Sequence, residues 1–466
     1  MPPGLFSSLF SLRRPIRRLA LACACLSATL PAQANPFETT LDNGMKVVVR
    51  EDHRAPSVVH MTWYRSGSID EPSGVTGVAH VLEHMMFKGT RKVGPGEFNA
   101  RVAALGGRDN AFTSRDFTSY FQQIPPAHLG TMMTLEADRM KNLALTDEAF
   151  SREIEVIKEE RRLRTDDRPR ALVHEQLMAA VFQAHPYQHP IIGWMTDLET
   201  MAAEDARTWY RNWYTPNNAT LVVVGDVDHQ AVFKLASQHY GLIKSTKLPV
   251  RRISNEPRQI GPRAVVVRAP AELPYLTMAW RVPSLRNPAA DREAYALQML
   301  GEILDGYDGA RLNRRLVREQ RIAVSAGASY DGVNRGPALF LLEGSPAPGQ
   351  SIEALEAALR AELRRIRDEG VSEEELNRVK NQALATRIYS RDSLMGQAIE
   401  IGQLESTGLS WRDDIRLLAG LRAVTAEEVR EVARRYFDDA NLTTARLDPL
   451  PLPASAPESH PAPQQP

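Results

Sequence analysis

The chain contains the run Gly77-Val-Ala-His-Val-Leu-Glu-His-Met-Met-Phe87, in which two histidines enclose a glutamate. On a helix, positions i and i+4 lie on one face and position i+3 lies beside them, so His80, Glu83 and His84 converge on one point. Two neutral imidazoles suit a Zn²⁺ ion, and the adjacent glutamate can take a proton from water at that ion. The alternative is a chance cluster on an amphipathic helix.

The chain is 466 residues long, which is too long for one ordinary hydrophobic core, so at least two domains are expected. Residues 1–34 differ from the rest, because four arginines precede the apolar run Leu19 to Leu30, and Ala32-Gln-Ala34 follows. This pattern predicts a secretory signal peptide cleaved after Ala34 and a periplasmic or secreted protein. The apolar run is too short for a permanent membrane anchor.

Both cysteines, Cys23 and Cys25, lie in that segment. Neither has the leucine three residues earlier that a lipoprotein signal would place there, so lipidation is the lesser alternative. The chain after residue 34 has no cysteine, so any metal there must be held by histidine and carboxylate side chains. Without its four arginines, the chain has 53 basic residues (57 − 4) against 57 acidic ones. This balance predicts no nucleic-acid partner and no anionic membrane surface.

An internal repeat of about 220 residues organises the rest of the chain, with matched segments at offsets of 226, 223 and 217. The first match pairs Leu145–Glu153 with Val371–Val379, and each segment has a capping hydroxyl before acidic residues, which predicts a helix start. Each copy combines β-branched runs with helical periodicity. We therefore expect an α+β fold of two homologous domains, each a sheet with helices packed on one face. The other matched pairs are Ala203–Arg207 with Ala426–Arg430, and Met61–Trp63 with Met278–Trp280.

Composition divides the chain into five parts. These are a signal peptide (1–34), an N-terminal domain with the metal site (35–245), a linker (246–263), a C-terminal homologous domain without metal ligands (264–448), and a proline-rich tail that we expect to be disordered (449–466).

Two imidazoles leave zinc short of a third protein ligand, and the acidic stretch at residues 153–162 is the best source of one. On a helical wheel, Glu153, Ile157 and Glu160 share a narrow sector that the isoleucine marks as buried. An inward carboxylate needs a partner or a metal. The geometry leaves open which glutamate coordinates, and whether both only pair with buried arginine or histidine.

The second copy provides an internal control for these residues. It has Val379 where the first copy has Glu153, Thr386 where the first has Glu160, and no imidazole in the region matching the histidine pair. The scaffold therefore folds without these polar side chains. This weighs against a purely structural role for them in the first copy.

The segment from His80 to Thr90 resembles the pitrilysin family of zinc peptidases, the inverzincins, which includes insulin-degrading enzyme and the mitochondrial processing peptidases. The resemblance covers about residues 36–446 and implies two homologous domains that form half of a peptidase chamber. It also implies a third ligand 76 residues after the second histidine, which is Glu160, and a supporting glutamate seven residues earlier, which is Glu153. Further stretches that resemble the family are Asn110–Thr113, His185–Tyr187, Pro190–Gly193 and Tyr214–Leu221.

The resemblance implies a catalytic mechanism as well. His80, His84 and Glu160 would hold one Zn²⁺ per chain, and Glu83 would take a proton from the attacking water and pass it to the leaving amine. An extended peptide would add as a strand to a sheet edge, with a turn as the alternative role for Asn110. The residues of that edge are Asn110, Ala111, Phe112 and Thr113.

One departure from the family changes the expected function. Active members also use an arginine and a tyrosine, seven residues apart in the half without metal, to bind the substrate carbonyl. Here Val317 and Val324 take those positions, and valine donates no hydrogen bond; a one-residue slip would bring in Arg318 but put Ser325 at the tyrosine position. We therefore expect the metal-bearing subunit of a two-subunit peptidase acting on peptides, in which a paralogous chain supplies the pair, or else a homodimer. The alternative is a non-catalytic core or assembly subunit of the same fold.

Overall fold

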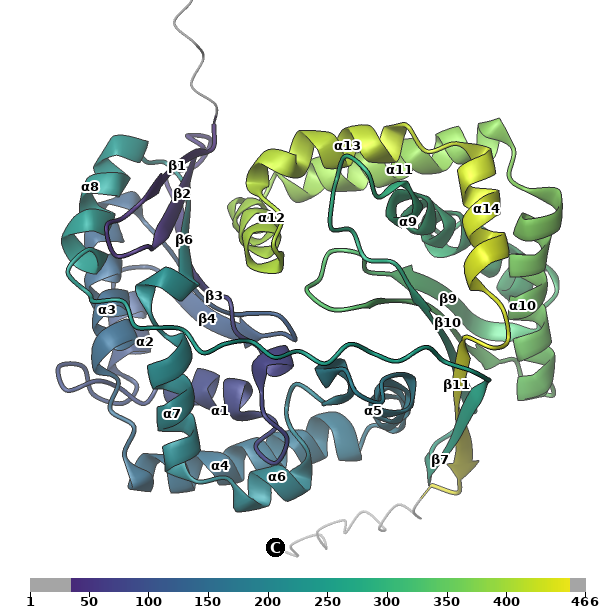
Figure 1. The fold of residues 1–466 in the computed structure, drawn as a ribbon, viewed down its shortest axis with the longest axis horizontal. Coiled ribbons are helices and arrows are strands. Elements are labelled where there is room, and N and C mark those ends of the chain that lie inside the picture. The colour runs from purple at the N-terminus through teal and green to yellow at the C-terminus, as the bar shows by residue number, and fades with distance from the viewer. Residues whose placement is uncertain (1–34, 453–466) are drawn as a thin grey trace, which may run out of the picture. The chain divides into compact units, whose positions relative to one another are not determined.

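The structure is a computed structural model that describes residues 35–452. The expected signal peptide, both cysteines and most of the expected tail lie outside the described residues. The described chain forms two sheets, each with its own set of helices (Figure 1). Across residues 35–452, none of the helices combines the length and apolar character needed to span a membrane.

The first sheet has six strands in the order β1-β2-β6-β3-β5-β4. Strands β2 and β6 are parallel and the other neighbours are antiparallel. Strand β4 lies at the edge and pairs only with β5 among the described strands. The strands are β1 (Phe37–Thr40), β2 (Lys46–Glu51), β3 (Val58–Tyr64), β4 (Arg108–Thr113), β5 (Thr118–Ile124) and β6 (Ala219–Gly225).

Most helices of the first half cover one face of this sheet and bury a large apolar cluster against it. The hydroxyl of Thr146 accepts the Ala149 N–H and starts α4, and a π-helical turn, Arg162–Asp166, extends that helix. The helices are α1 (Val78–Met85), α2 (Glu97–Ala104), α3 (Leu129–Asn142), α4 (Asp147–Arg161), α5 (Pro169–Val181), α6 (Met195–Thr200), α7 (Ala203–Trp213) and α8 (His229–Tyr240).

The second sheet has five strands in the order β7-β11-β8-β10-β9, with β7 and β11 parallel. Its strands are β7 (Arg263–Pro270), β8 (Tyr275–Val282), β9 (Ala323–Tyr330), β10 (Ala338–Pro346) and β11 (Leu442–Leu450). Its helices are α9 (Arg292–Asp305), α10 (Ile352–Glu369), α11 (Glu373–Ser390), α12 (Leu394–Thr407), α13 (Asp414–Arg422) and α14 (Ala426–Tyr436).

The structure confirms the α+β class and the repeat. Helices α4 and α11, which the sequence matches, both begin after a capping hydroxyl, since Ser372 accepts the Glu375 N–H as Thr146 accepts the Ala149 N–H. Helices α7 and α14 begin at the matched residues Ala203 and Ala426. One architecture is therefore used twice.

The second face of each sheet is covered by a helix from the other half of the chain, which the sequence analysis did not anticipate. Helix α12 packs on β3 and β6, whereas α5 packs on β7, β8 and β11 (Figure 1). The run Leu221–Val224 in β6 is buried on both faces, as expected for a strand covered from both sides. At Gly402 in α12, any side chain would collide with the ring of Trp63 in the first sheet, so glycine permits this close approach.

The C-terminal strand extends beyond the expected end of the second domain. The expected tail begins at Pro449, but Pro449 and Leu450 continue β11 and pair with β7. Proline is tolerated where a neighbouring strand has ended, and β8 pairs with β11 only as far as Leu447.

Candidate metal centre

Helix α1 carries the histidine pair and is fixed by a close backbone contact. Its N-cap, Gly77, has φ +87° and packs against the backbone of Ile192 and Gly193, where a side chain would clash. Val81, Leu82 and Met85 anchor the buried side of the helix in the core. His80, Glu83 and His84 are only partly buried and lie on the remaining surface, as the sequence predicted.

The structure brings the two histidines together with Glu160 on the last turn of α4. The Oε2 atom of Glu160 lies 3.2 Å from Nε2 of His84 and 3.9 Å from Nε2 of His80. In a tetrahedral zinc site with bonds of about 2.0–2.1 Å, ligand atoms are separated by about 3.3 Å. The three ligand atoms all lie within 4.8 Å of one another, so this donor set fits a zinc ion with small adjustments.

The second inward glutamate, Glu153, contacts the other ring nitrogen of His84 and lies outside the group of three. Glu153 accepts from Nδ1 of His84 at 2.9 Å and from Nζ of Lys88 at 2.5 Å. Its contact with Nδ1 leaves Nε2 of His84 directed at Glu160, an arrangement typical of metal-binding histidines. Of the two inward glutamates, Glu160 is the one whose carboxylate lies beside both imidazoles.

The protonation of the two imidazoles differs. Burial lowers the pKa of His84, but hydrogen bonds with Glu153 and Glu160 outweigh it and raise that pKa to about 9. Burial lowers the pKa of His80 to about 4, and its buried Nδ1 has no hydrogen-bond partner among residues 35–452. The two carboxylates around His84 favour positive charge at this point. This observation also fits a metal cation.

Glu83 lies beside the donor set and contacts the edge of the first sheet. Its Oε2 accepts a hydrogen bond from Oγ1 of Thr113 at 2.5 Å, and burial raises its pKa. Both residues line a cavity of about 530 Å³ that also reaches His80 and Glu160. A group entering this cavity would therefore meet the expected base together with His80 and Glu160.

The expected substrate edge is a regular strand. Asn110 pairs with Phe121 inside β4, so the alternative of a turn residue is wrong. Ala111 contacts the first core, whereas Phe112 packs edge-to-face on Trp63 on the opposite side. The sequence thus placed these residues correctly at a sheet edge.

The two valines at the expected arginine and tyrosine positions lie away from this cavity. Val317 is in a π-helical segment, Asn313–Glu319, and packs on the second core. Val324 on β9 is 44% exposed, and neither valine lines the 530 Å³ cavity.

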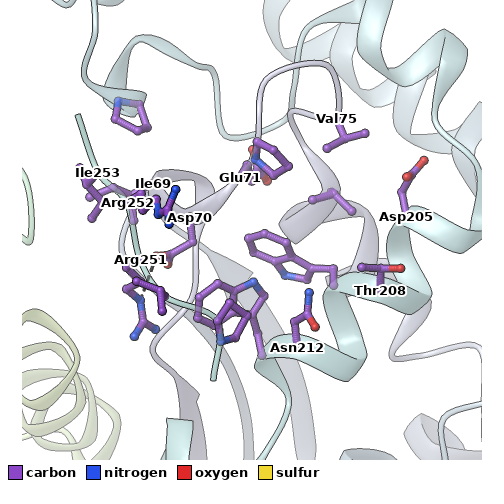
Figure 2. A pocket seen from close by; sticks show the side chains of 17 residues that line it. Ile69, Asp70, Glu71, Val75, Asp205, Thr208, Asn212, Arg251, Arg252 and Ile253 are labelled. Carbon is purple, nitrogen blue, oxygen red and sulfur yellow. Dashed lines mark hydrogen bonds and ion pairs between the residues drawn. The ribbon is translucent and has the colours of Figure 1, made fainter. Parts of the chain in front are cut away.

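A buried carboxylate that the sequence analysis missed caps helix α1. Glu71 is 5% exposed and accepts the N–H groups of Gly77 at 2.8 Å and Ala79 at 2.9 Å. Burial raises its pKa to about 8, against the lowering effect of these two hydrogen bonds. Glu71 borders a second cavity, of about 400 Å³, which also contains Asp205 from α7 (Figure 2). In the sequence, the only sign of this helix cap is the acidic pair Asp70-Glu71, which precedes the histidine motif.

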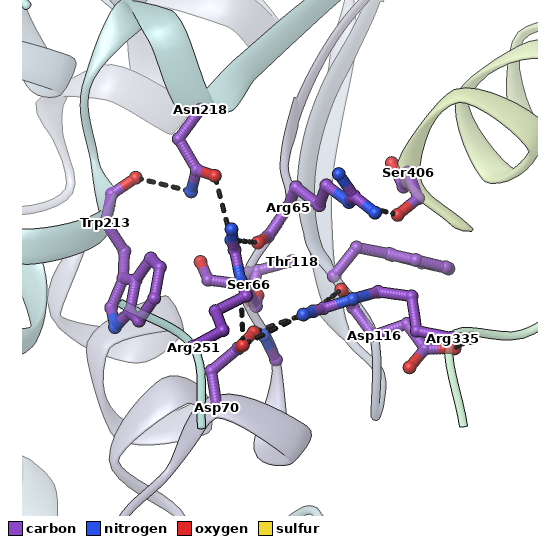
Figure 3. A network of polar contacts seen from close by, with 12 residues as sticks. Arg65, Ser66, Asp70, Asp116, Thr118, Trp213, Asn218, Arg251, Arg335 and Ser406 are labelled. Carbon is purple, nitrogen blue, oxygen red and sulfur yellow. Dashed lines mark hydrogen bonds and ion pairs between the residues drawn. The ribbon is translucent and has the colours of Figure 1, made fainter. Parts of the chain in front are cut away.

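The residue before this cap links the two halves of the chain. The carboxylate of Asp70 forms a two-point ion pair with Arg335, from the β9–β10 connection, at 2.7 and 2.9 Å. It also accepts a hydrogen bond from Nε of Arg251 at 3.0 Å (Figure 3). The backbone N–H of Arg335 also donates to Asp116. Next to it, Gly336 donates to the hydroxyl of Tyr187. The contact therefore involves both halves and the segment between them.

A duplicated α+β scaffold with two histidines and a glutamate in one copy defines a metallopeptidase of the inverzincin type. Residues 46–194 match the family model for the insulinase family, peptidase family M16, and residues 200–383 match the model for the M16 inactive domain. The chain belongs to peptidase family M16 and is a zinc metallopeptidase.

Individual relatives agree with this assignment. The chain is 30% identical to the zinc protease PqqE of Helicobacter pylori over 451 residues, which cover 94% of this chain and 99% of that one. The crystal structure of a protease from Helicobacter pylori superimposes with a TM-score of 0.84 at 29% identity, over 89% of this chain and 100% of that chain. The periplasmic protease PqqL of Escherichia coli shares the fold, with a TM-score of 0.77 at 20% identity, over 90% of this chain and 48% of that one.

Proposed function

We propose that this chain hydrolyses peptides with one zinc ion held by His80, His84 and Glu160. The observation that carries the proposal is the convergence of the ligand atoms of these three side chains within 4.8 Å, with Glu83 lining the same cavity as His80 and Glu160. When bound, the ion would supply Lewis acidity, which polarises a carbonyl and lowers the pKa of water.

The roles of the protein side chains follow from their contacts. Glu83 acts as the general base and then delivers the proton to the leaving amine. The hydroxyl of Thr113 holds one Glu83 oxygen at 2.5 Å, which leaves the other oxygen to meet water. Glu153 fixes the ring of His84 through Nδ1.

The substrate binds in this proposal as an extended strand along β4. The strand is at the sheet edge, and Ala111, Phe112 and Thr113 line the cavity with Glu83. Main-chain hydrogen bonds to a free edge hold a peptide without requiring a fixed sequence. Asn110 begins this edge.

Glu83→Gln tests the proposal, with Glu155→Gln on the exposed face of α4 as the control. Glu83→Gln should keep zinc and lose hydrolysis, whereas His80→Ala should lose zinc itself. Hydrolysis that survives Glu83→Gln would show that Glu83 is not the base.

We also propose that the active enzyme contains a second subunit. Val317 and Val324 cannot supply hydrogen bonds to an oxyanion, and they lie outside the cavity. The chain matches 48% of PqqL, whose single chain is about twice as long, which supports a paired arrangement. The test compares the purified chain with the chain plus an adjacent paralogous gene product. Full activity of the isolated monomer would contradict the proposal.

The remaining assignments rest on sequence pattern. We propose a signal peptide at 1–34, an N-terminal peptidase domain at 35–245, a linker at 246–263 and a homologous domain from 264 onward. The structural similarity to PqqL, a periplasmic protease, supports a periplasmic location. Mass analysis of the mature protein tests both cleavage after Ala34 and lipidation.

A further inference from the structure

Arg115 lies two residues beyond the end of β4, at a wall shared by two cavities. It lines the 530 Å³ cavity of the metal centre and also an adjoining cavity of about 320 Å³. His174 on α5 lines the same two cavities. The adjoining cavity extends to Leu339 and Leu341 on β10, so both halves of the chain form it.

The guanidinium of Arg115 has no anionic partner in the part of the chain that the structure describes. Within residues 35–452, no carboxylate forms an ion pair with it, and its Nε is buried without a hydrogen bond. Its Nη2 lies 3.5 Å from Nε2 of His174, and its guanidinium carbon lies 5.7 Å from the Tyr187 ring centre. Burial lowers the pKa of Arg115, which indicates that its charge is poorly compensated.

The nearby carboxylates are engaged elsewhere. Asp116 accepts from the hydroxyl of Tyr187 at 2.5 Å and from the backbone N–H of Arg335 at 2.9 Å. Asp331 accepts the N–H of Val333 at 3.1 Å. Burial, together with the charge of Arg115, lowers the pKa of His174, so His174 stays neutral and can accept or donate one hydrogen bond.

Arg115 is partly buried, with its Nε fully covered, and a charge withdrawn from water is costly unless it is paired. We propose that Arg115, assisted by His174, binds a carboxylate of the peptide substrate next to the scissile bond. This inference rests on the proposed function, since it names the substrate class of the same site. A peptide extending along β4 past Thr113 would bring its next residues to Arg115.

The surroundings favour a carboxylate at the end of an aliphatic stem. Met178 and Ile191 line both cavities beside Arg115 and offer apolar contact. Guanidinium forms two parallel hydrogen bonds with a carboxylate, and a site shielded from water strengthens them. The carboxylate is either an acidic side chain or the free C-terminus of a short peptide, and the test separates these sources.

The test measures binding to protein carrying Glu83→Gln, so that no substrate is consumed. Fluorescein-labelled peptides are compared by anisotropy in pairs that differ in one Glu-to-Gln change, each with a free or an amidated C-terminus. We expect an acidic peptide to bind at least about tenfold more tightly than its neutral twin, as hydrogen bonds to charged groups imply. If tight binding is lost when Glu is changed to Gln, the bound carboxylate is that of an acidic side chain. If tight binding is lost when the C-terminus is amidated, the bound carboxylate is the C-terminus.

Two variants and one control locate the effect. Arg115→Gln should abolish the preference, whereas Arg115→Lys should retain part of it, and thermal unfolding verifies that both fold. Arg101→Gln removes an exposed arginine paired with Glu97 and should leave the preference unchanged.

Three results would overturn the assignment. The first is equal binding of all peptides by the Glu83→Gln protein, whether they carry Glu or Gln and whether the C-terminus is free or amidated. The second is a preference that persists in Arg115→Gln, and the third is a preference lost equally in Arg101→Gln. Hydrolysis of peptides without any charge preference would overturn the role of Arg115 and leave the proposed function intact. Failure of every peptide to bind the Glu83→Gln protein, together with failure of the chain plus its paralogous subunit to hydrolyse any of them, would overturn both.

Discussion

The carboxylate of Asp70 and the guanidinium of Arg335 form a buried two-point ion pair, in which the side chains are only 1% and 5% exposed. The residues come from opposite halves of the chain, and Figure 3 shows Arg251 on the same carboxylate. The next residue, Glu71, caps the helix that carries the two histidines. A short segment therefore joins the contact between the halves to the metal-binding helix.

Removing either partner of the buried ion pair should destabilise the protein. Asp70→Asn should lower the free energy of unfolding by about 3–5 kcal/mol, because it leaves the buried Arg335 without its carboxylate. Arg335→Met should lower it by less, because Asp70 keeps its ion pair with Arg251. Urea denaturation of the single and double variants measures this. The double variant should lose less than the sum of the two.

An exposed ion pair is the control for this prediction. Arg268 and Asp448 lie 3.0 Å apart, but their side chains are 72% and 52% exposed. Arg268→Met should change the free energy of unfolding by no more than about 1 kcal/mol. Similar losses for Arg268→Met and Asp70→Asn, or strict additivity in the buried pair, would contradict the account.

The cap on α1 should affect metal binding as well as stability. In Glu71→Gln, the amide nitrogen would face a backbone N–H, so one of the two hydrogen bonds is lost. We expect a loss of about 1–2 kcal/mol in stability, typical of helix caps, and up to about tenfold weaker zinc binding. Chelator competition measures the zinc affinity.

Asp205 offers a matched control in the same cavity (Figure 2). It accepts the Ala202 N–H at 2.8 Å and caps α7, which carries none of the proposed ligands. Asp205→Asn should lower stability but leave zinc affinity unchanged. Equal effects of the two variants on zinc affinity would show that the cap does not position the ligands.

The contact between Glu153 and His84 should strengthen zinc binding without supplying a ligand. Glu153→Gln should weaken zinc affinity by about 10–100-fold, as outer-shell changes typically do, while the protein still binds one ion. Glu155→Gln is the control, because its carboxylate is 66% exposed and pairs with Lys158 away from the proposed ligands. Unchanged zinc affinity in Glu153→Gln would show that Glu153 does not strengthen zinc binding.

Acid should destabilise the fold partly through His185. Burial lowers its pKa to about 4, and its Nδ1 accepts the Tyr187 N–H at 3.2 Å, which requires the neutral ring. The unfolded chain takes up a proton near its ordinary pKa of about 6.5, before the folded chain does. The stability from His185 is thus complete above about pH 6.5 and is lost as the pH falls toward 4.

The free energy of unfolding, measured between pH 7 and pH 4, tests whether His185 contributes to the loss of stability in acid. Stability should fall less steeply in His185→Gln than in the parent protein. Parallel pH profiles for the two proteins would show that His185 does not titrate differently on folding.

Local rules predicted much of the fold and the site. Capping hydroxyls located the starts of α4 and α11, and helical spacing placed His80 and His84 on one face and Glu160 on the inward side of α4. These features depend on residues within a few turns of one another. Sequence periodicity is informative at that range.

Long-range pairing could not be predicted in the same way. The apolar face of α5 shows that the helix is buried, but not that it covers the second sheet. No spacing rule connects Asp70 with Arg335, 265 residues later. Glu71 caps α1 from six residues before Gly77, outside the reach of the capping box.

The account depends most directly on Glu160 as the third ligand. Zinc content after extensive dialysis should be about one ion per chain in the parent protein and in Glu155→Gln. It should be far below one in Glu160→Gln, with the fold retained by circular dichroism. Full zinc content in Glu160→Gln, or its absence from the parent protein supplied with zinc, would contradict the proposed site.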